Sequence, residues 1–293
     1  MLTRRSFGKL SLAALAVAST RNLFAAATLR KPLGLQLYTI RKEAEKDLPG
    51  VLKAIHEIGY TEVEPYWNIY NHPAKELKKM LADNGLTAPS GHFDYDKVAT
   101  SFDYAQELGV KYMICPILDE SLWSSLDSYK KVAENFNKWG AEAQKRGLKF
   151  GFHNHNYEFK ELPAKNSGLP AGAPANGYSI LWHFTDPKLV MFEMDCYWIA
   201  QAGLDPVKFL DKHGSRIRLL HLKDRKAGFP PSQWKDKAAE HFTEVGSGTI
   251  DWKAVLAAAK RNNIEHMYVE NDEPERPAIE SLRISYNYLQ KLL

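Results

Sequence analysis

The segment LKFGFHNHNYEF, residues 148–159, begins as an apolar strand and ends in imidazole, amide and carboxylate side chains. In an extended chain successive side chains point to opposite faces, so His153 and His155 share one face while Phe150 and Phe152 share the other. Two neighbouring imidazoles suit a divalent metal ion, or one metal ligand with a proton carrier beside it. They also suit a strand end whose histidines are only hydrogen-bonded, and the rest of the sequence decides between these interpretations.

The same design recurs along the chain, where apolar strand-like runs alternate with amphipathic segments of helical period. The expected strands are GLQLYT (34–39), YTEVEPY (60–66), TAPSGHF (87–93), VKYMICP (110–116), LKFGFH (148–153), LVMFEMD (189–195), IRLLHL (217–222) and HMYVEN (266–271). The expected helices lie at 48–59, 74–85, 103–109, 128–147, 205–214, 251–263 and 278–293. Several of them end in Gly or Asn just before the next strand, as helix stops should.

This order of elements predicts a (β/α)8 TIM barrel, an α/β fold of about 250 residues whose strands and helices alternate. A doubly wound open sheet is the alternative fold. Only the fifth crossover is irregular, because the stretch from Leu162 to Gly177 is rich in Gly, Pro, Ala and Asn and is expected to be a long surface loop. The units share no fixed sequence period, which argues against a repeat array. We therefore expect one domain spanning residues 28–293.

The N-terminal segment, residues 1–27, has the pattern of a signal peptide. A basic start containing Arg4, Arg5 and Lys9 precedes a short apolar run, and the small residues Ala25 to Ala27 offer a cleavage site. The arginine pair resembles the twin-arginine export signal, and an ordinary secretory signal is the alternative. The apolar run is too short for a membrane anchor, which needs about 20 residues. We expect a periplasmic protein with no membrane association after cleavage.

Charge and cysteine content exclude several classes of partner. The whole chain has a formal charge of +4, but residues 1–27 hold four of the 39 basic residues and no acid, which leaves 35 basic against 35 acidic residues. A near-neutral mature protein gives no electrostatic reason to expect nucleic acid or an anionic membrane as partner. Cys115 and Cys196 both lie in strand-like runs, so two unpaired buried thiols are favoured over a disulfide.

Polar side chains end several of the expected strands on the inward face. In a TIM barrel the carboxyl ends of the strands meet at the active site, so these side chains should converge. Unpaired charges inside a barrel would each cost several kcal/mol, whereas one divalent cation compensates them together. The sequence therefore predicts a metal site, although Glu62 or Glu193 alone would suit a structural hydrogen bond. The inward set is Glu62, Glu64, His92, His153, His155, Glu193, Asp195, His221 and Glu270.

Four of these residues carry a family likeness, together with the motifs HLKD (221–224) and VGSGTIDW (245–252). In this order they resemble the xylose isomerase-like TIM barrels, the superfamily of sugar epimerases and endonuclease IV. The resemblance implies one Mn, Mg, Co or Zn ion held by side chains from strands 5 to 8. Carried over by position, the ligands would be His153, Asp195, His221 and Glu270. The GSGT turn has no Lys after its glycines and is not expected to bind phosphate.

The chain departs from the epimerase pattern at two positions. Strand 5 carries His153 where the epimerases have a glutamate that binds metal and moves a proton, so either His153 is the ligand or Glu158 folds back to restore the acidic set. Trp198 stands where the epimerases often have a substrate-binding histidine. The His-x-His pattern is similar to that of the dehydratase branches, inosose dehydratases included, in which the second histidine transfers protons. The resemblance thus implies catalytic roles for His155, Glu158 and Glu270.

The shared chemistry of the family is proton abstraction beside a carbonyl, stabilised by the ion. The first hypothesis is a metal-dependent sugar isomerase or epimerase, and the alternative is a lyase that eliminates a β-substituent from a keto sugar or 3-keto-glycoside. DNA repair of the endonuclease IV kind is disfavoured by the neutral charge and the export signal, and a non-catalytic sugar-binding barrel stays as a fourth possibility. Oligomerisation is compatible with the sequence. The residues expected to contact a sugar are Tyr38, Glu64, Trp67, His92, Trp198 and Lys223.

Overall fold

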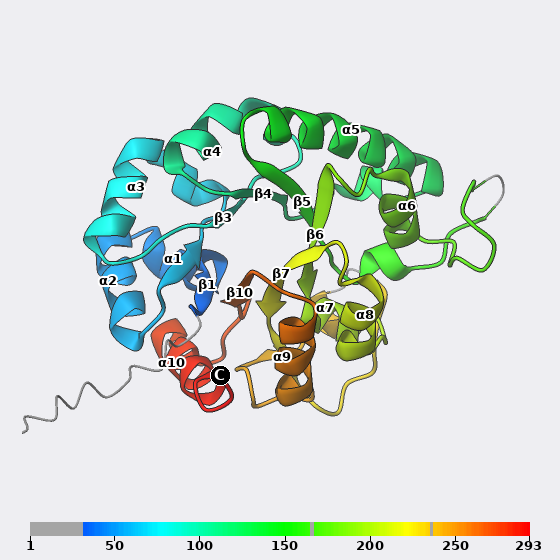
Figure 1. Ribbon diagram of the computed structural model, residues 1–293. Helices are drawn as coiled ribbons and strands as arrows, with labels where there is room; N and C mark the ends of the chain where they lie inside the picture. Colours follow the sequence, from blue (N-terminus) through cyan, green and yellow to red (C-terminus); the bar gives the residue numbers. More distant parts are fainter. Residues whose placement is uncertain (1–31, 165–166, 235–236) are drawn as a thin grey trace, which may run out of the picture. The chain divides into compact units, whose positions relative to one another are not determined.

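Eight parallel strands surrounded by helices form the barrel that the sequence predicts (Figure 1). The structure is a computed structural model and describes residues 32–164, 167–234 and 237–293, so the predicted signal peptide lies outside the described residues. The barrel strands are β1 (Gly34–Gln36), β2 (Glu62–Glu64), β3 (Ser90–His92), β4 (Tyr112–Cys115), β5 (Lys149–His153), β6 (Val190–Asp195), β7 (Ile217–Leu222) and β10 (His266–Val269). Each lies within one of the eight predicted runs.

The strands follow one another around the barrel in the order of the sequence. Parallel pairs join β3 to β4, β5, β6, β7, β10, β1 and β2 in turn. The remaining gap between β2 and β3 is bridged by backbone hydrogen bonds from Val63 N–H to Thr87 O (2.8 Å) and from His92 N–H to Pro65 O (2.9 Å). These bonds nearly close the barrel and exclude the open-sheet alternative.

Helices cover the outside of the barrel, and all seven predicted helices are present. They are α2 (Leu48–Ile58), α3 (Ala74–Asp83), α4 (Phe102–Leu108), α5 (Leu126–Lys145), α8 (Pro206–His213), α9 (Trp252–Arg261) and α10 (Ala278–Leu289). Helix α2 shows how the sequence sets the ends of a helix. It begins where the Asp47 carboxylate accepts the Gly50 N–H, and it ends at Gly59, which has φ 121°. Among the described residues three α-helices were not predicted: α1 (Arg41–Ala44), α6 (Gly177–Phe184) and α7 (Cys196–Gln201).

The predicted secondary structure of Cys196 was wrong. The sequence placed Cys196 in a strand-like run, but it is the first residue of α7, because the Asp195 carboxylate accepts the Trp198 N–H at 2.9 Å and starts the helix. Both cysteines are buried and unpaired, as predicted. The described part of the stretch from 162 to 177 is a loop up to Gly177, where α6 begins.

Inside the barrel an apolar layer lies beneath the polar strand ends. Tyr112, Ile114, Met191 and Leu219 form a buried cluster of their own. A Cβ atom at Gly151 would lie 2.1 Å from the Met191 sulfur and 2.9 Å from Ile114 Cδ1, so a larger residue here would displace these two side chains. The packed layer supports the polar side chains above it without contributing to their chemistry.

A two-stranded antiparallel sheet, β8 (Asp224–Arg225) with β9 (Phe242–Thr243), follows β7. It holds the ends of the loop from 226 to 241 above the carboxyl end of β7. The side-chain amide of Asn156 anchors this loop by donating to Ser232 O (2.8 Å) and Trp234 O (2.9 Å).

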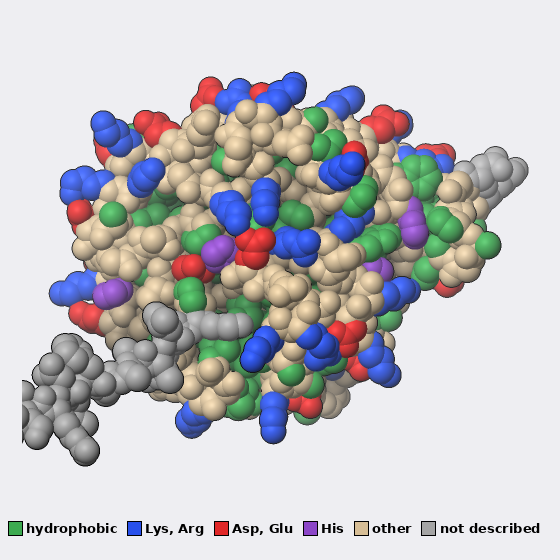
Figure 2. All heavy atoms as spheres, in the orientation of Figure 1, with side chains coloured by type: hydrophobic (Ala, Val, Ile, Leu, Met, Phe, Trp, Pro, Cys, Tyr) green, Lys and Arg blue, Asp and Glu red, His purple; other side chains and the backbone are tan. Residues whose placement is uncertain are grey.

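The surface agrees with the near-neutral charge. Figure 2 shows one face of the molecule, on which Lys and Arg side chains alternate with Asp and Glu around the rim. Within the described residues, no helix combines the length and apolarity needed to cross a membrane.

Candidate active site

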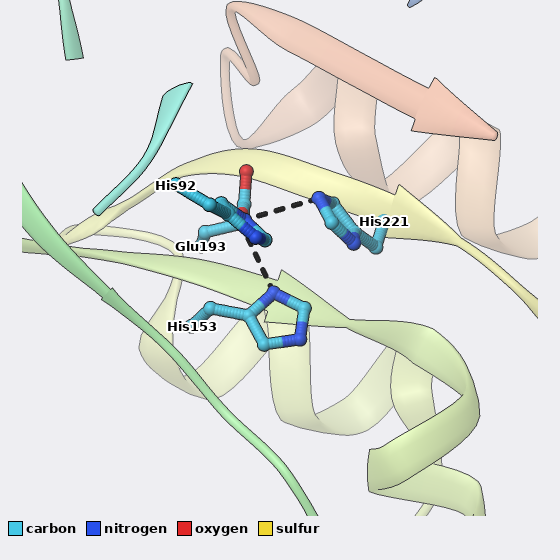
Figure 3. Close-up of side chains that lie close together, drawn as sticks. All are labelled: His92, His153, Glu193 and His221. Atoms are coloured by element: carbon cyan, nitrogen blue, oxygen red, sulfur yellow. Dashed lines mark hydrogen bonds and ion pairs between the residues drawn. The ribbon is translucent and has the colours of Figure 1, made fainter. Parts of the chain in front are cut away.

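Two overlapping groups of buried side chains occupy the carboxyl ends of the strands. The deeper group contains His92 of β3, His153 of β5, Glu193 of β6 and His221 of β7 (Figure 3). The second group contains Asp195, His221 and Glu270, which lie at the ends of β6, β7 and β10. In each group the donor atoms lie within 4.8 Å of one another, so the two together offer six side chains for a cation.

The deeper group is organised around one carboxylate oxygen. Glu193 Oε2 lies 2.9 Å from His92 Nε2, 3.1 Å from His153 Nδ1 and 3.2 Å from His221 Nε2. Three ring nitrogens thus point at a single anionic acceptor. Each imidazole keeps a second nitrogen that faces elsewhere.

Those second nitrogens of His153 and His221 face the second group. His153 Nε2 lies 3.7 Å from Asp195 Oδ2, and His221 Nδ1 lies 4.0 Å from the same oxygen and 2.8 Å from Glu270 Oε2. These are separations that ligands around one divalent ion have, since each metal–ligand bond is about 2.0–2.2 Å. Of the four residues predicted as ligands, Asp195, His221 and Glu270 therefore form one donor group, and His153 lies beside it through Asp195.

A second set of hydrogen bonds supports the centre from below. Glu64 Oε2 accepts from Gln36 Nε2 (2.8 Å) and His221 Nε2 (2.7 Å), and Glu64 Oε1 accepts from the Ser90 hydroxyl. Gln36 Nε2 also lies 3.2 Å from His92 Nδ1. Glu64 is fully buried, so it acts beneath the cavity and not as a residue on its wall.

The pKa values follow from burial and from these neighbours. Burial would lower the pKa of both His92 and His221, but Glu64 and Glu193 raise the pKa of His92 to about 9, and Glu193 and Glu270 raise that of His221 well above its usual value. Burial and the adjacent His221 lower the pKa of His153. The neighbouring carboxylates therefore favour the protonated form of His92 and of His221, against the effect of burial.

Lys223 is the other positive charge at the centre. Its Nζ lies 2.8 Å from Glu270 Oε2, 2.8 Å from Asp272 Oδ1 and 3.2 Å from Asp195 Oδ2. Burial opposes the charge, yet Asp195 and Asp272 raise the pKa of Lys223 well above its usual value. One lysine cannot balance the four buried carboxylates of Glu64, Glu193, Asp195 and Glu270 in addition to Asp272, so the donor set fits a divalent cation.

A cavity of about 240 Å³ opens directly above the centre. Tyr38 and Trp67 line one part of it, and their ring centroids are 5.7 Å apart. His155 and Trp198 line another part, with ring centroids 5.0 Å apart. The remaining lining residues are Tyr66, His92, Pro116, Ile117, His153, Lys223, Glu240, Glu270 and Asp272.

The cavity brings together most of the residues predicted to contact substrate. Tyr38, Trp67, His92, Trp198 and Lys223 all line it, whereas Glu64 lies below. His155 follows β5 and is half-buried, while His153 is only 2% exposed, which agrees with the expected difference in depth.

Two predicted acids lie apart from the centre. Glu158 belongs to neither donor group; its Oε2 accepts the backbone N–H of His155 at 2.8 Å and so fixes the turn after β5. Glu62 pairs with His266, whose Nδ1 lies 2.9 Å from Glu62 Oε2. His266 is the first residue of β10, so this pair lies toward the amino ends of the strands and is structural.

Sequence reasoning missed Gln36, Ser90, Glu240 and Asp272 as residues of the site or its support. Gln36 lies opposite Glu64 in the adjacent strand, and Ser90 lies two positions before His92 on β3, so both face the barrel interior. The alternation of side chains along these strands could therefore have identified them from the sequence. Asp272 and Glu240 follow strands in loops, where no periodicity could have placed them.

The motifs HLKD (221–224), which begins in β7, and VGSGTIDW (245–252) are joined by hydrogen bonds. Asp224 of HLKD accepts hydrogen bonds from Gly246 N–H (2.9 Å), Gly248 N–H (3.1 Å) and the Trp252 indole (2.7 Å) through Oδ2. Its Oδ1 accepts from Arg225 N–H (2.8 Å) and Ile250 N–H (3.3 Å). The glycine-rich turn therefore binds the protein's own carboxylate.

The chain belongs to the xylose isomerase-like TIM barrel family, whose sequence profile matches residues 52–291. An inosose dehydratase of Clostridium beijerinckii is 25% identical over 243 residues, which cover 72% of this chain and 77% of that relative. The crystal structure of a sugar phosphate isomerase/epimerase from Parabacteroides distasonis superposes with a TM-score of 0.72 at 29% identity, covering 90% of this chain and 95% of that one. Relatives of both kinds support an enzyme acting on a sugar-like small molecule.

The fold is also that of a structure described as the IOLI protein with a binding zinc atom. The TM-score is 0.66, the identity is 17%, and the superposition covers 89% of this chain and 97% of that one. At this identity the likeness concerns the fold alone.

Proposed function

We propose that this chain is a divalent-metal-dependent lyase that removes the proton beside the carbonyl of an unphosphorylated keto sugar and eliminates a β-oxygen substituent. The observation that carries the proposal is the half-buried imidazole of His155 on the cavity wall, directly above a buried set of metal donors. Inosose dehydratases among the relatives support elimination as the outcome.

Four side chains would hold the ion: His153 through Nε2, His221 through Nδ1, and the carboxylates of Asp195 and Glu270. A bound divalent ion supplies Lewis-acid stabilisation of the negative charge that develops on the carbonyl oxygen. Glu270 and His153 also line the cavity, so this donor set opens toward the substrate.

His155 is assigned the proton transfer. Its ring lies 5.2 Å from that of His153 and 5.0 Å from that of Trp198, and Glu158 fixes its backbone. An imidazole side chain can both accept a proton and return it near neutral pH. In the elimination the α C–H electron pair forms the new C=C bond, the β C–O bond breaks with its electron pair on oxygen, and that oxygen takes the proton and leaves as water or an alcohol.

The charge of the cavity supports a neutral substrate. Of the described residues that line it, only Lys223 is a Lys or Arg, and this side chain already contacts three carboxylates. Glu240, Glu270 and Asp272 add negative charge to the same wall. A phosphate group in the cavity would meet acids and no uncommitted cation.

Isomerisation or epimerisation of a sugar is the second candidate. It is favoured by the likeness to the Parabacteroides distasonis protein, which covers more of this chain than the dehydratases do. Both reactions begin with removal of the same proton. They differ in whether that proton returns to carbon or a β-substituent leaves.

NMR in deuterated water distinguishes the two reactions. A 3-keto-glucoside is incubated with zinc-loaded protein, and elimination predicts release of the aglycone with an unsaturated sugar. Deuterium retained in an intact sugar would assign isomerisation instead. The His155→Ala variant serves as the control, and neither product with the wild-type protein would contradict the proposal.

The fourth ligand is tested by metal content. His153→Ala should lose the ion, whereas Glu158→Ala should keep it, because Glu158 lies outside both donor groups. The opposite pattern would make Glu158 the ligand after a rearrangement of the turn.

The proposed function includes export of the protein to the periplasm. The twin-arginine pattern at Arg4 and Arg5 supports a periplasmic location, reached by a folded protein that acquires its ion in the cytoplasm.

A further inference from the structure

One buried carboxylate beneath the candidate metal centre, that of Glu193, contacts three imidazoles at once. Glu193 is fully buried, and its Oε2 lies within 3.2 Å of ring nitrogens from His92, His153 and His221. Figure 3 shows these three rings arranged around the Glu193 side chain. Two of the rings, those of His153 and His221, belong to the proposed ligand set.

We infer that Glu193 is a positioning residue that fixes the tautomer and orientation of both imidazole ligands, and that it does not itself bind the ion. The inference rests on the metal-binding part of the proposed function and is independent of the reaction catalysed.

The hydrogen bonds decide which nitrogen of each ring remains for the ion. When His153 donates Nδ1–H to Glu193, its Nε2 lone pair is directed toward Asp195 Oδ2, 3.7 Å away. When His221 donates Nε2–H to Glu193 and Glu64, its Nδ1 lone pair is directed toward Glu270. A ligating histidine generally donates its other N–H to a carboxylate or carbonyl, which also makes the ligating nitrogen more basic.

His92 holds the carboxylate in place. Its Nε2 lies 2.9 Å from Glu193 Oε2, and its Nδ1 lies 3.2 Å from the Gln36 amide nitrogen. Because the Gln36 amide nitrogen is a donor, His92 Nδ1 accepts its hydrogen bond, and His92 Nε2–H donates to the Glu193 carboxylate. Glu193 is thus fixed from β3 as well as from β5 and β7.

An ion in the deeper group would take Glu193 as a ligand, and the hydrogen bonds of Glu193 argue against this. Its Oε2 already lies 2.9, 3.1 and 3.2 Å from three ring nitrogens, which are hydrogen-bond separations. An ion bound there would break these contacts, whereas His153 Nε2 and His221 Nδ1 face away from Glu193, toward Asp195 and Glu270.

The experiment measures zinc binding and uses a matched pair of carboxylates. Glu193→Gln keeps the shape of the side chain and removes its charge, and Glu193→Ala removes the acceptor altogether. Glu62→Gln and Glu62→Ala are the controls, because Glu62 is also buried and paired with an imidazole, the half-buried His266 at 2.9 Å, but lies outside the centre. Zinc affinity is measured by competition with a chromophoric chelator, Co²⁺ spectra report ligand geometry, and thermal unfolding of the metal-free proteins reports folding.

The inference predicts that zinc binds about tenfold more weakly to Glu193→Gln and about 100-fold more weakly to Glu193→Ala, with altered Co²⁺ spectra and one ion per chain throughout. The Glu62 variants should bind zinc as the wild-type protein does. Should Glu193→Ala fail to fold, the Gln variant still decides. If Glu193→Gln has the zinc affinity and Co²⁺ spectrum of the wild-type protein, the inference is wrong, but the proposed function is unaffected. The same holds if the wild-type chain binds two ions and the Glu193 variants lose one of them. A wild-type protein that binds no zinc would overturn the proposed function as well.

Discussion

Asp224 should be among the most important single side chains for stability, and its contacts allow the magnitude to be worked out. It is fully buried and accepts five hydrogen bonds, three through Oδ2 and two through Oδ1. In Asp224→Asn one of the two oxygens becomes an NH2 group, which must face at least two N–H donors whichever way the amide turns. Each buried donor left without an acceptor costs about 1–3 kcal/mol, so the free energy of unfolding should fall by about 4 kcal/mol.

Thermal and urea unfolding in chelator buffer, followed by circular dichroism, measure this loss without a contribution from bound metal. At roughly 2–4 °C per kcal/mol for a domain of this size, the melting temperature should fall by about 8–16 °C. Asp251→Asn is the matched control, since Asp251 only caps α9 by accepting the Ala254 N–H at 3.0 Å and asparagine caps helices equally well. A melting temperature for Asp224→Asn within 3 °C of the control would refute the reasoning.

Three further predictions concern the centre and export. His155→Ala should keep its ion but lose on the order of 10²-fold or more in kcat, the scale of a general acid or base, whereas Asp195→Ala should lose the ion. Elemental analysis measures the metal content of both variants, and equal metal loss in the two would exclude the proton-transfer role of His155. Zinc binding should strengthen as the pH rises and release a proton at pH 7. The reason is that Glu193 and Glu270 raise the pKa of His221 despite its burial, so the ion must displace a proton from this ring. Calorimetry in buffers of different ionisation enthalpy measures the proton release, and finding none would contradict the prediction. Replacing Arg4 and Arg5 by Lys should leave the protein in the cytoplasm, and fractionation that finds normal export would exclude the twin-arginine route.

The barrel could be predicted because its signal is repeated. Most of the eight strand-like runs are followed by a segment of helical period, and so regular an alternation allows only a few arrangements. Helix α7 could not be predicted from periodicity, because CYWIAQ is short and its residues are mostly buried. Its start depends on the Asp195 side chain, which caps the helix with one oxygen and faces His153 of the candidate metal site with the other.

Strand parity predicted the face of each site residue but not its depth. Glu62 and Glu64 are two positions apart on β2, yet the first pairs with His266 outside the centre and the second supports His221. Glu193 was placed inward, but its contacts with three imidazoles depend on side-chain rotamers that a sequence pattern does not specify. Loop residues such as Asp272 have no parity at all, so only the folded chain brings them to the cavity.

The central claim is that the donor set of His153, Asp195, His221 and Glu270 enables removal of a proton beside a carbonyl. Its most direct test is proton NMR of a keto sugar in deuterated water, with chelator-stripped protein, the same protein after zinc is restored, and Asp195→Ala. The account predicts loss of the α-proton signal only with the zinc-restored wild-type protein. Equal loss with the stripped protein or with Asp195→Ala would contradict it.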